Sequence, residues 1–189
     1  MQFNLDDTIA HLRRTPMVLE HLLASMPEAW THGNYGPQTF SPFDVVGHLI
    51  HGERTDWMPR VRLILDHGEE HAFEPFDRYA HYEASRGKSV TDLLEIFASV
   101  RAENVASLES LQLNETDFQR RGTHPAFGSV TLAQLLATWV VHDLHHVAQI
   151  CKAMSYQYRE AVGPWRAYLG IITQAEAAAP SASASSGGD

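Results

Sequence analysis

The stretch 140–154, VVHDLHHVAQICKAM, carries three of the chain's twelve histidines and otherwise reads as a buried helix. Successive residues of an α-helix are rotated by about 100°, so His142 and His146, one turn apart, point in the same direction. His145 points toward the flank of that line. Two imidazoles at positions i and i+4 are the arrangement with which a helix offers two nitrogen atoms to one metal ion. The stretch therefore indicates part of a metal site whose third ligand must come from another element.

His48 is the candidate for that third ligand. It belongs to a predicted long helix, beside an apolar arc that should face the protein interior, and Gly52, one turn further on, leaves space next to it. Three histidines from two helices, with coordination positions left open to water, are typical of a catalytic metal site. Structural zinc sites usually close their coordination, often with cysteine, and Cys151 is the single cysteine of this chain. The residue types favour an open three-histidine site.

Core packing is the competing interpretation of these histidines. A single histidine on an apolar helix face more often packs in a core than binds a metal, and spacing alone leaves both interpretations open for the pair. Asp143 falls within the apolar arc of the same helix, where an unpaired carboxylate is costly. We predict that it accepts a hydrogen bond from a metal-binding histidine on another helix. Four further histidines are predicted to lie on a solvated surface: His32, His67, His71 and His81.

Other catalytic chemistries fit the sequence less well. The chain contains no Glu-x-x-His of a di-iron bundle, no His-Glu-x-x-His, no Gly-x-Ser-x-Gly and no glycine loop that could hold phosphate. Cys151 lies near the interior edge of its helix, which favours a buried, inert thiol over a nucleophile. Candidates for a general base are Glu53, which we expect near the mouth of the bundle, His51 and His145. The competing interpretation of each is a surface residue or one that supports the site without taking part in catalysis.

Helices must position these side chains, because the chain shows helical periodicity and little of the alternation that marks strands. We predict helices over residues 4–14, 16–25, 41–68, 89–111, 131–154 and 163–174. Their starts are marked by Thr15 before Pro16 and by three capping-box pairs, Ser41–Asp44, Ser89–Asp92 and Thr131–Gln134. A kink is expected at Pro59.

The helix 41–68 carries apolar residues on two arcs, one of which includes Phe43, Ile50 and Trp57. A helix that is apolar on two sides is either central in a bundle or faces a second subunit. Residues 69–88 read as a long crossover loop, with room for a short helix, and residues 113–130 as a second irregular connection. We therefore predict an all-α four-helix bundle with crossover loops and a short extra C-terminal helix.

Length and composition set further expectations. A chain of 189 residues suits one domain, which we place at residues 1–174, and the Ala/Ser/Gly-rich tail 175–189 is predicted to be disordered. The net charge of −9 argues against a nucleic-acid partner, since phosphate binding needs clustered Lys and Arg. No signal peptide and no membrane segment is evident. A soluble cytoplasmic protein is the expectation.

Three stretches together carry a resemblance to a known family: TPMVLEHLLASMPEAW, FSPFDVVGHLIHGERTDWMPRVRLIL and GSVTLAQLLATWVVHDLHHVAQI. Over roughly Leu5–Leu169 the chain resembles the DinB-like superfamily, within the broader DinB/YfiT-like group of metalloenzymes. The resemblance implies a four-helix bundle in an up-down-down-up arrangement, usually a homodimer. It also implies a divalent metal ion, in many relatives zinc or nickel, held by His48, His142 and His146.

The resemblance implies less about activity. Some relatives are thiol S-transferases or isomerases that use a low-molecular-weight thiol, and others are assigned as hydrolases. Three neutral imidazoles leave an ion its full charge, so a bound water or thiol becomes strongly acidic. We expect a metal-dependent enzyme that acts on a small molecule, either a hydrolase or a thiol transferase. The alternatives are a non-catalytic, stress-associated metal-binding dimer and, less favoured, a protein with a vestigial site whose pocket binds a small ligand.

Overall fold

The computed structural model describes residues 1–178. Four long helical rods form the body of the molecule. They are α1 (Leu5–Leu23), α3 (Pro42–Thr55) continued by α4 (Trp57–His67), α6 (Val90–Ser110) and α8 (Leu132–Tyr156). The smaller elements are α2 (Glu28–Thr31), α5 (His81–Ala84), α7 (Glu115–Phe118), β1 (Arg121–His124), β2 (Gly128–Thr131), the 3-10 helix η1 (Gly163–Tyr168) and α9 (Gly170–Ala178).

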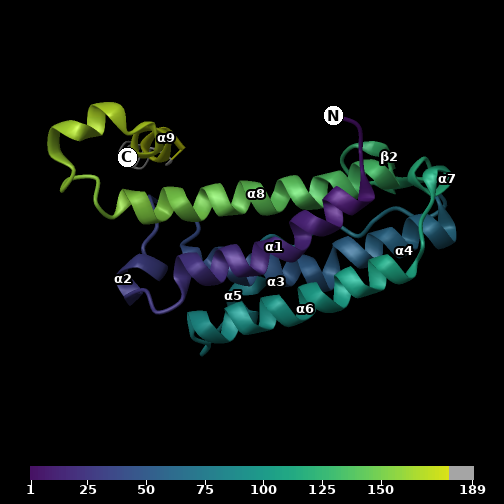
Figure 1. Cartoon of the computed structure of the whole chain (residues 1–189), viewed down its shortest axis with the longest axis horizontal. Coiled ribbons are helices and arrows are strands. Elements are labelled where there is room, and N and C mark those ends of the chain that lie inside the picture. The colour runs from purple at the N-terminus through teal and green to yellow at the C-terminus, as the bar shows by residue number, and fades with distance from the viewer. Residues whose placement is uncertain (179–189) are drawn as a thin grey trace, which may run out of the picture.

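The rods form the predicted four-helix bundle. Helix α1 packs against α6 and α8, and α3 packs against the same two helices, so α1 and α3 are diagonal partners. Helices α1 and α8 run in one direction while α3–α4 and α6 run in the other, which is the up-down-down-up arrangement (Figure 1). The crossover between α4 and α6 therefore runs back along the bundle, whereas the connection between α6 and α8 stays at one end (Figure 1).

Capping boxes start three of the four rods, as predicted. The side chains of Ser41, Ser89 and Thr131 each accept the backbone N–H of the residue three positions on, and that residue's side chain accepts the backbone N–H of the cap. Each pair satisfies two backbone donors that a helix start otherwise leaves open.

Pro16 does not begin a new helix, contrary to our prediction. Helix α1 continues through it from Leu5 to Leu23. A proline inside a helix leaves the carbonyl four residues earlier without its usual N–H partner. Here that carbonyl belongs to Leu12, and it accepts a hydrogen bond from the guanidinium of Arg101 at 2.9 Å. The tertiary contact replaces the lost helical bond, so the helix does not have to end.

The predicted kink at Pro59 is a break located three residues earlier. Asp56 is both the C-cap of α3 and the N-cap of α4, with φ −115° and ψ −65°. The ring of a helical proline clashes with the carbonyl four residues before it, which here is that of Thr55, the last residue of α3. Pro59 is thus the cause of the distortion, as predicted, but the helix is interrupted next to the Thr55 carbonyl and not at the proline itself.

Both apolar arcs of the α3–α4 rod are buried within the chain. Ile50 packs in a core cluster with α1, α6 and α8, while Trp57 packs in a second cluster that extends toward the β1–β2 end of the bundle. The arc that we had considered for a second subunit is therefore covered by the chain's own elements. The homodimer stays a prediction, and its surface must lie elsewhere.

Of the two long connections, one contains the short helix that the sequence allowed for, and the other contains more structure than the sequence indicated. Residues 69–88 include α5, as expected. Residues 113–130, predicted to be irregular, include α7 and an antiparallel hairpin in which Arg121 pairs with Thr131 and His124 with Gly128. Strands of four residues are too short to show alternation against a helical background.

The C-terminal part also differs from its prediction. The segment 163–174 is not one helix, because it divides into η1 and α9 at Leu169. Helix α9 extends to Ala178, so the first four residues of the predicted disordered tail are helical, with Ala175 fully buried. The rest of that tail lies outside the described residues. Among residues 1–178, no helix combines the length and apolar character needed to cross a membrane.

Candidate metal centre

His48 of α3 and His142 and His146 of α8 converge inside the bundle. Each offers a nitrogen atom, and these nitrogens lie within 4.8 Å of one another. The Nε2 atoms of His142 and His146 are 3.1 Å apart, and the ring centroid of His48 is 4.7 Å from that of His146. The structure thus brings together the three residues that the sequence selected.

The nitrogen atoms of this cluster fit a metal ion better than core packing. Zinc binds imidazole nitrogens at about 2.0–2.1 Å, which in a tetrahedral site separates two nitrogens by about 3.3 Å. The separation of 3.1 Å between His142 and His146 is close to that value. In addition, Nδ1 of His48 is buried without a hydrogen-bond partner among the described residues. Histidines that serve only as core residues normally have buried nitrogens hydrogen-bonded.

Burial keeps all three imidazoles neutral. Burial is the largest cause that lowers the pKa of His48 to about 3, of His142 to about 2 and of His146 to about 4. Neighbouring imidazoles lower the pKa values further, because a second positive charge in the cluster would be repelled. Metal ligation requires the deprotonated form of histidine, so these side chains need not lose a proton near neutral pH.

Gln149 orients His146. The Nδ1 of His146 donates to Oε1 of Gln149 at 2.8 Å, which leaves Nε2 with its lone pair on the side of His142. Such a partner on the far nitrogen commonly fixes the tautomer and ring orientation of a metal-binding histidine. The signal in the sequence is a glutamine three residues after the second histidine of His-x-x-x-His.

Asp143 does not accept a hydrogen bond from a histidine, contrary to our prediction. Its carboxylate binds the guanidinium of Arg101 from α6, with contacts of 2.6 and 2.9 Å. It also accepts the hydroxyl of Thr15 at 2.7 Å. Burial alone would lower the pKa of Arg101, but the carboxylates of Asp143 and Glu53 outweigh burial and raise it. The partner that a buried Asp143 requires is therefore Arg101, an arginine from the opposite side of the bundle.

Glu53 does not lie at the mouth of the bundle, where we had predicted it as a general base. The residue is 2% exposed, and Oε1 accepts from Arg101 at 2.8 Å and from Nε1 of Trp139 at 2.9 Å. Oε2 accepts from Asn104 at 2.9 Å. Both oxygens are committed to structural hydrogen bonds, which argues against a role in proton transfer.

Arg101 is the residue that sequence reasoning missed. It lies four residues after Phe97 and four before Val105 on the inner face of α6, and it is 1% exposed. An arginine at that register among apolar residues needs carboxylate partners inside the protein. The spacing of Arg101 on its helix, together with the need of Asp143 for a buried partner, could have identified this arginine from the sequence.

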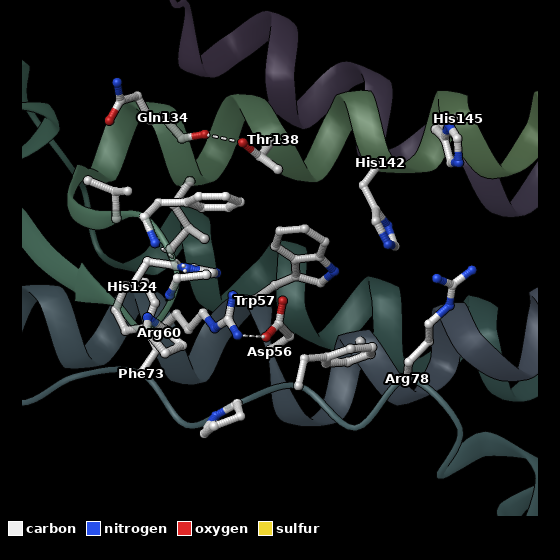
Figure 2. A pocket seen from close by; sticks show the side chains of 18 of the residues that line it. Asp56, Trp57, Arg60, Phe73, Arg78, His124, Gln134, Thr138, His142 and His145 are labelled. Atoms are coloured by element: carbon white, nitrogen blue, oxygen red, sulfur yellow. Dashed lines mark hydrogen bonds and ion pairs between the residues drawn. The ribbon is translucent and has the colours of Figure 1, made fainter.

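A cavity of about 800 Å³ opens beside the three histidines. Its walls are mainly aromatic and aliphatic side chains from the bundle, the 69–88 crossover and the β1–β2 hairpin (Figure 2). Trp57 and His142 point into it, and Gly52 also lines it (Figure 2). His145 is exposed at the rim, with its ring centroid 5.3 Å from that of His146. A catalytic role for His145 stays a prediction.

The other predicted surface histidines divide into two groups. His32, His67 and His71 are exposed, as predicted. His81, by contrast, is fully buried, and its ring centroid lies 5.6 Å from that of His48. The acidic, histidine-rich stretch around it suggested a solvated loop, but the crossover folds this residue against the wall of the bundle. Its Nδ1 lies 3.1 Å from the backbone carbonyl of Arg78.

Comparisons with known proteins show the family and the fold of the chain. The sequence model of the DinB superfamily matches residues 11–150. Among solved structures, the fold is similar to that of YfiT from Bacillus subtilis, described as a "probable metal-dependent hydrolase with an unusual four-helix bundle topology". The TM-score is 0.67 at 24% sequence identity, over 83% of this chain and 87% of that one. No curated protein matches the chain.

Proposed function

Because the chain belongs to the DinB superfamily, we propose that it is a metal-dependent hydrolase of a small-molecule substrate. In this proposal His48, His142 and His146 hold one divalent cation, zinc or nickel, at the wall of the cavity. The observation that carries the proposal is the cluster of three neutral imidazoles, two buried and that of His142 half-buried, which no carboxylate joins among the described residues. The description of YfiT as a "probable metal-dependent hydrolase" supports the same reaction type.

Each residue of the site has a separate task in this proposal. When bound, a divalent cation held by three neutral ligands would supply Lewis-acid polarisation and an acidified water molecule. Gln149 holds His146 in the required tautomer through the 2.8 Å hydrogen bond. Trp57 and Phe76, both in the cavity wall, bind the apolar part of a substrate and exclude bulk water. His145 at the rim is retained as the residue that transfers a proton to or from solvent.

Elemental analysis of purified protein tests the metal site. We expect about one equivalent of zinc or nickel in the wild type and its loss in His142→Ala and in His146→Ala. His11→Ala, which removes an exposed histidine of α1, should retain the metal. Full retention of metal by both site variants would overturn the assignment.

Turnover tests the reaction class. The metal-loaded protein is screened against carboxylic esters, amides and lactones, with and without chelator, and in parallel against electrophiles in the presence of low-molecular-weight thiols. Chelator-sensitive hydrolysis supports the proposal. Activity that requires a thiol would identify an S-transferase instead. Stoichiometric metal without any turnover, together with a large loss of thermal stability on chelation, would favour a non-catalytic role.

A further inference from the structure

We propose that Arg78 is an anion-binding residue of the cavity, and that the substrate joins a carboxylate to an apolar body. This inference rests on the proposed function, since it names the substrate class of the same site. Arg78 lies in the crossover between α4 and α5 and lines the cavity that contains the three histidines.

The guanidinium of Arg78 is directed at the candidate metal centre. In Figure 2 it rises from the crossover toward the side of α8 that carries His142 and His145. Arg78 lines the same cavity as His48, His142 and His146. A group bound to this guanidinium would therefore lie beside the reacting part of a substrate.

Arg78 is free to bind an anion, whereas the other arginine of the cavity is not. Arg60 forms an ion pair with Asp56 at 2.6 Å and donates to the carbonyl of Glu74 at 3.3 Å. Within residues 1–178, no carboxylate lies within ion-pair distance of Arg78. Its guanidinium instead lies over the ring of Phe40, 5.4 Å from the centroid. A guanidinium stacked on a ring keeps the N–H groups along its edge available for a bidentate contact.

Hydrogen bonds fix the backbone around Arg78, an exposed residue whose guanidinium lies over Phe40. His81, which is fully buried, donates from Nδ1 to the carbonyl of Arg78 at 3.1 Å. Asp77 accepts the backbone N–H of Tyr79 at 2.9 Å and so closes the turn around Arg78. Phe40 is only 2% exposed and forms a fixed platform. Because the arginine is positioned before a ligand arrives, less conformational entropy is lost on binding.

The charge of the cavity is opposite to that of the whole chain. The chain has a net charge of −9, but the formally charged residues of the cavity wall are two arginines and one aspartate. The resulting positive potential attracts an anion into a site that the rest of the surface would repel. The remaining lining is largely aromatic and includes Trp57 and Phe127. A carboxylate attached to an aromatic or aliphatic body matches both features.

A pair of probes that differ only in charge tests this inference. Binding of 4-phenylbutyrate and of its neutral amide, 4-phenylbutanamide, is measured by calorimetry on the metal-loaded protein. We expect the acid to bind about tenfold more tightly, because charge-assisted hydrogen bonds are stronger than neutral ones. Arg78→Met should remove this preference without weakening amide binding, and Arg78→Lys should retain part of it.

Two controls separate Arg78 from other causes. Arg86→Met removes the same charge from an exposed residue that pairs with Glu83 outside the cavity, and it should leave the preference unchanged. A His142→Ala/His146→Ala variant, which lacks two of the proposed metal ligands, should keep the preference if Arg78 causes it. Loss of the preference in that variant together with its retention in Arg78→Met would assign carboxylate binding to the metal and overturn the inference.

Binding and turnover separate this inference from the proposed function. If Arg78→Met loses the preference but the wild type hydrolyses nothing, the anion site stands and the hydrolase proposal fails. If the wild type hydrolyses esters but binds acid and amide equally, the hydrolase proposal stands and the role of Arg78 is overturned.

Discussion

At the scale of single residues, the imidazole of His146 has one nitrogen bound to Gln149 and the other beside His142. No comparable partner fixes His142, whose Nδ1 is buried without a hydrogen bond among the described residues. Among the described residues, Gln149 is therefore the only side chain outside the cluster that forms a hydrogen bond with one of the three histidines. This hydrogen bond sets the tautomer of His146.

Replacing Gln149 should weaken metal binding without loss of the fold. Loss of the hydrogen-bond partner of a metal-binding histidine commonly costs about 10–100-fold in affinity. We expect a decrease in this range for Gln149→Leu, measured by competition with a chromophoric chelator. Gln149→Glu keeps an acceptor at the same position and should bind the metal about as well as the wild type. Equal affinity of Gln149→Leu and the wild type would contradict this role.

Arg101 should be essential for stability. It bridges Asp143 and Glu53 inside the bundle, so Arg101→Met leaves two buried carboxylates without their cation. Breaking a buried ion pair by removing one partner costs about 3–5 kcal/mol. Urea denaturation should show a decrease of this size in the free energy of unfolding. Arg62→Met, at an exposed residue bonded to Ser107, is the control and should change it by less than about 0.5 kcal/mol.

The cause of that loss can be checked by removing the carboxylates as well. In Arg101→Met combined with Glu53→Gln and Asp143→Asn, no buried charge remains unpaired, so part of the lost stability should return. If the triple variant is no more stable than Arg101→Met, packing of the guanidinium is the dominant contribution.

At the scale of elements, every rod contributes to the polar network around Arg101. Thr15 of α1 and Arg101 of α6 both contact Asp143 of α8, and Arg101 also contacts Glu53 of α3. The proline in α1 has a part in this network, because it frees the Leu12 carbonyl that accepts from Arg101. The network holds α3 and α8 in a fixed relation, and these are the helices that carry His48, His142 and His146.

The capping box of α6 should contribute measurably to stability. Ser89 accepts the backbone N–H of Asp92, whose carboxylate accepts both the backbone N–H and the hydroxyl of Ser89. Replacement of an N-cap serine by alanine typically costs about 1 kcal/mol. We expect this decrease for Ser89→Ala in urea denaturation. Ser99→Ala, at an exposed residue within the same helix, should change the free energy of unfolding by less than about 0.5 kcal/mol.

The same cap predicts a dependence on pH. The backbone and hydroxyl hydrogen bonds from Ser89 lower the pKa of Asp92 below its ordinary value. This contribution to stability is therefore complete above the pKa of the unfolded carboxylate and is lost as the pH falls through the lower, folded value. The difference in melting temperature between the wild type and Asp92→Asn should be larger at pH 7 than near pH 3. An equal difference at both pH values would contradict the assignment.

At the scale of the whole molecule, the candidate metal centre joins α3 to α8 across the bundle. A ligand that binds only the folded state stabilises it, by about 2.7 kcal/mol at a free concentration one hundred times its Kd. We expect zinc to raise the melting temperature and a chelator to lower it. The His142→Ala/His146→Ala variant should melt at the same temperature with either addition. A zinc effect of equal size in that variant would locate the metal outside the three histidines.

The homodimer remains a prediction, but the apolar face that first suggested it is not available for a second subunit. The Ile50 and Trp57 face that suggested it is buried within the chain, whereas Met17, Val141 and Leu144 are the apolar residues of α1 and α8 that are most exposed. Sedimentation of the purified protein measures the association state directly, and a single species with the mass of one chain would refute the prediction.

Helix periodicity, capping and the placement of His142 and His146 on one face of a helix could be predicted from the sequence, because each depends on residues within one or two turns of a helix. The choice of His48 also followed from the register of its helix and from the family resemblance. The partner of Asp143, the burial of His81 and the displacement of Glu53 from the cavity mouth were decided by the tertiary structure. The contacts of Arg101 span 48 residues to Glu53 and 42 to Asp143. The cost of burying a charge depends on which partners other helices bring to it, and local periodicity contains no information about those partners.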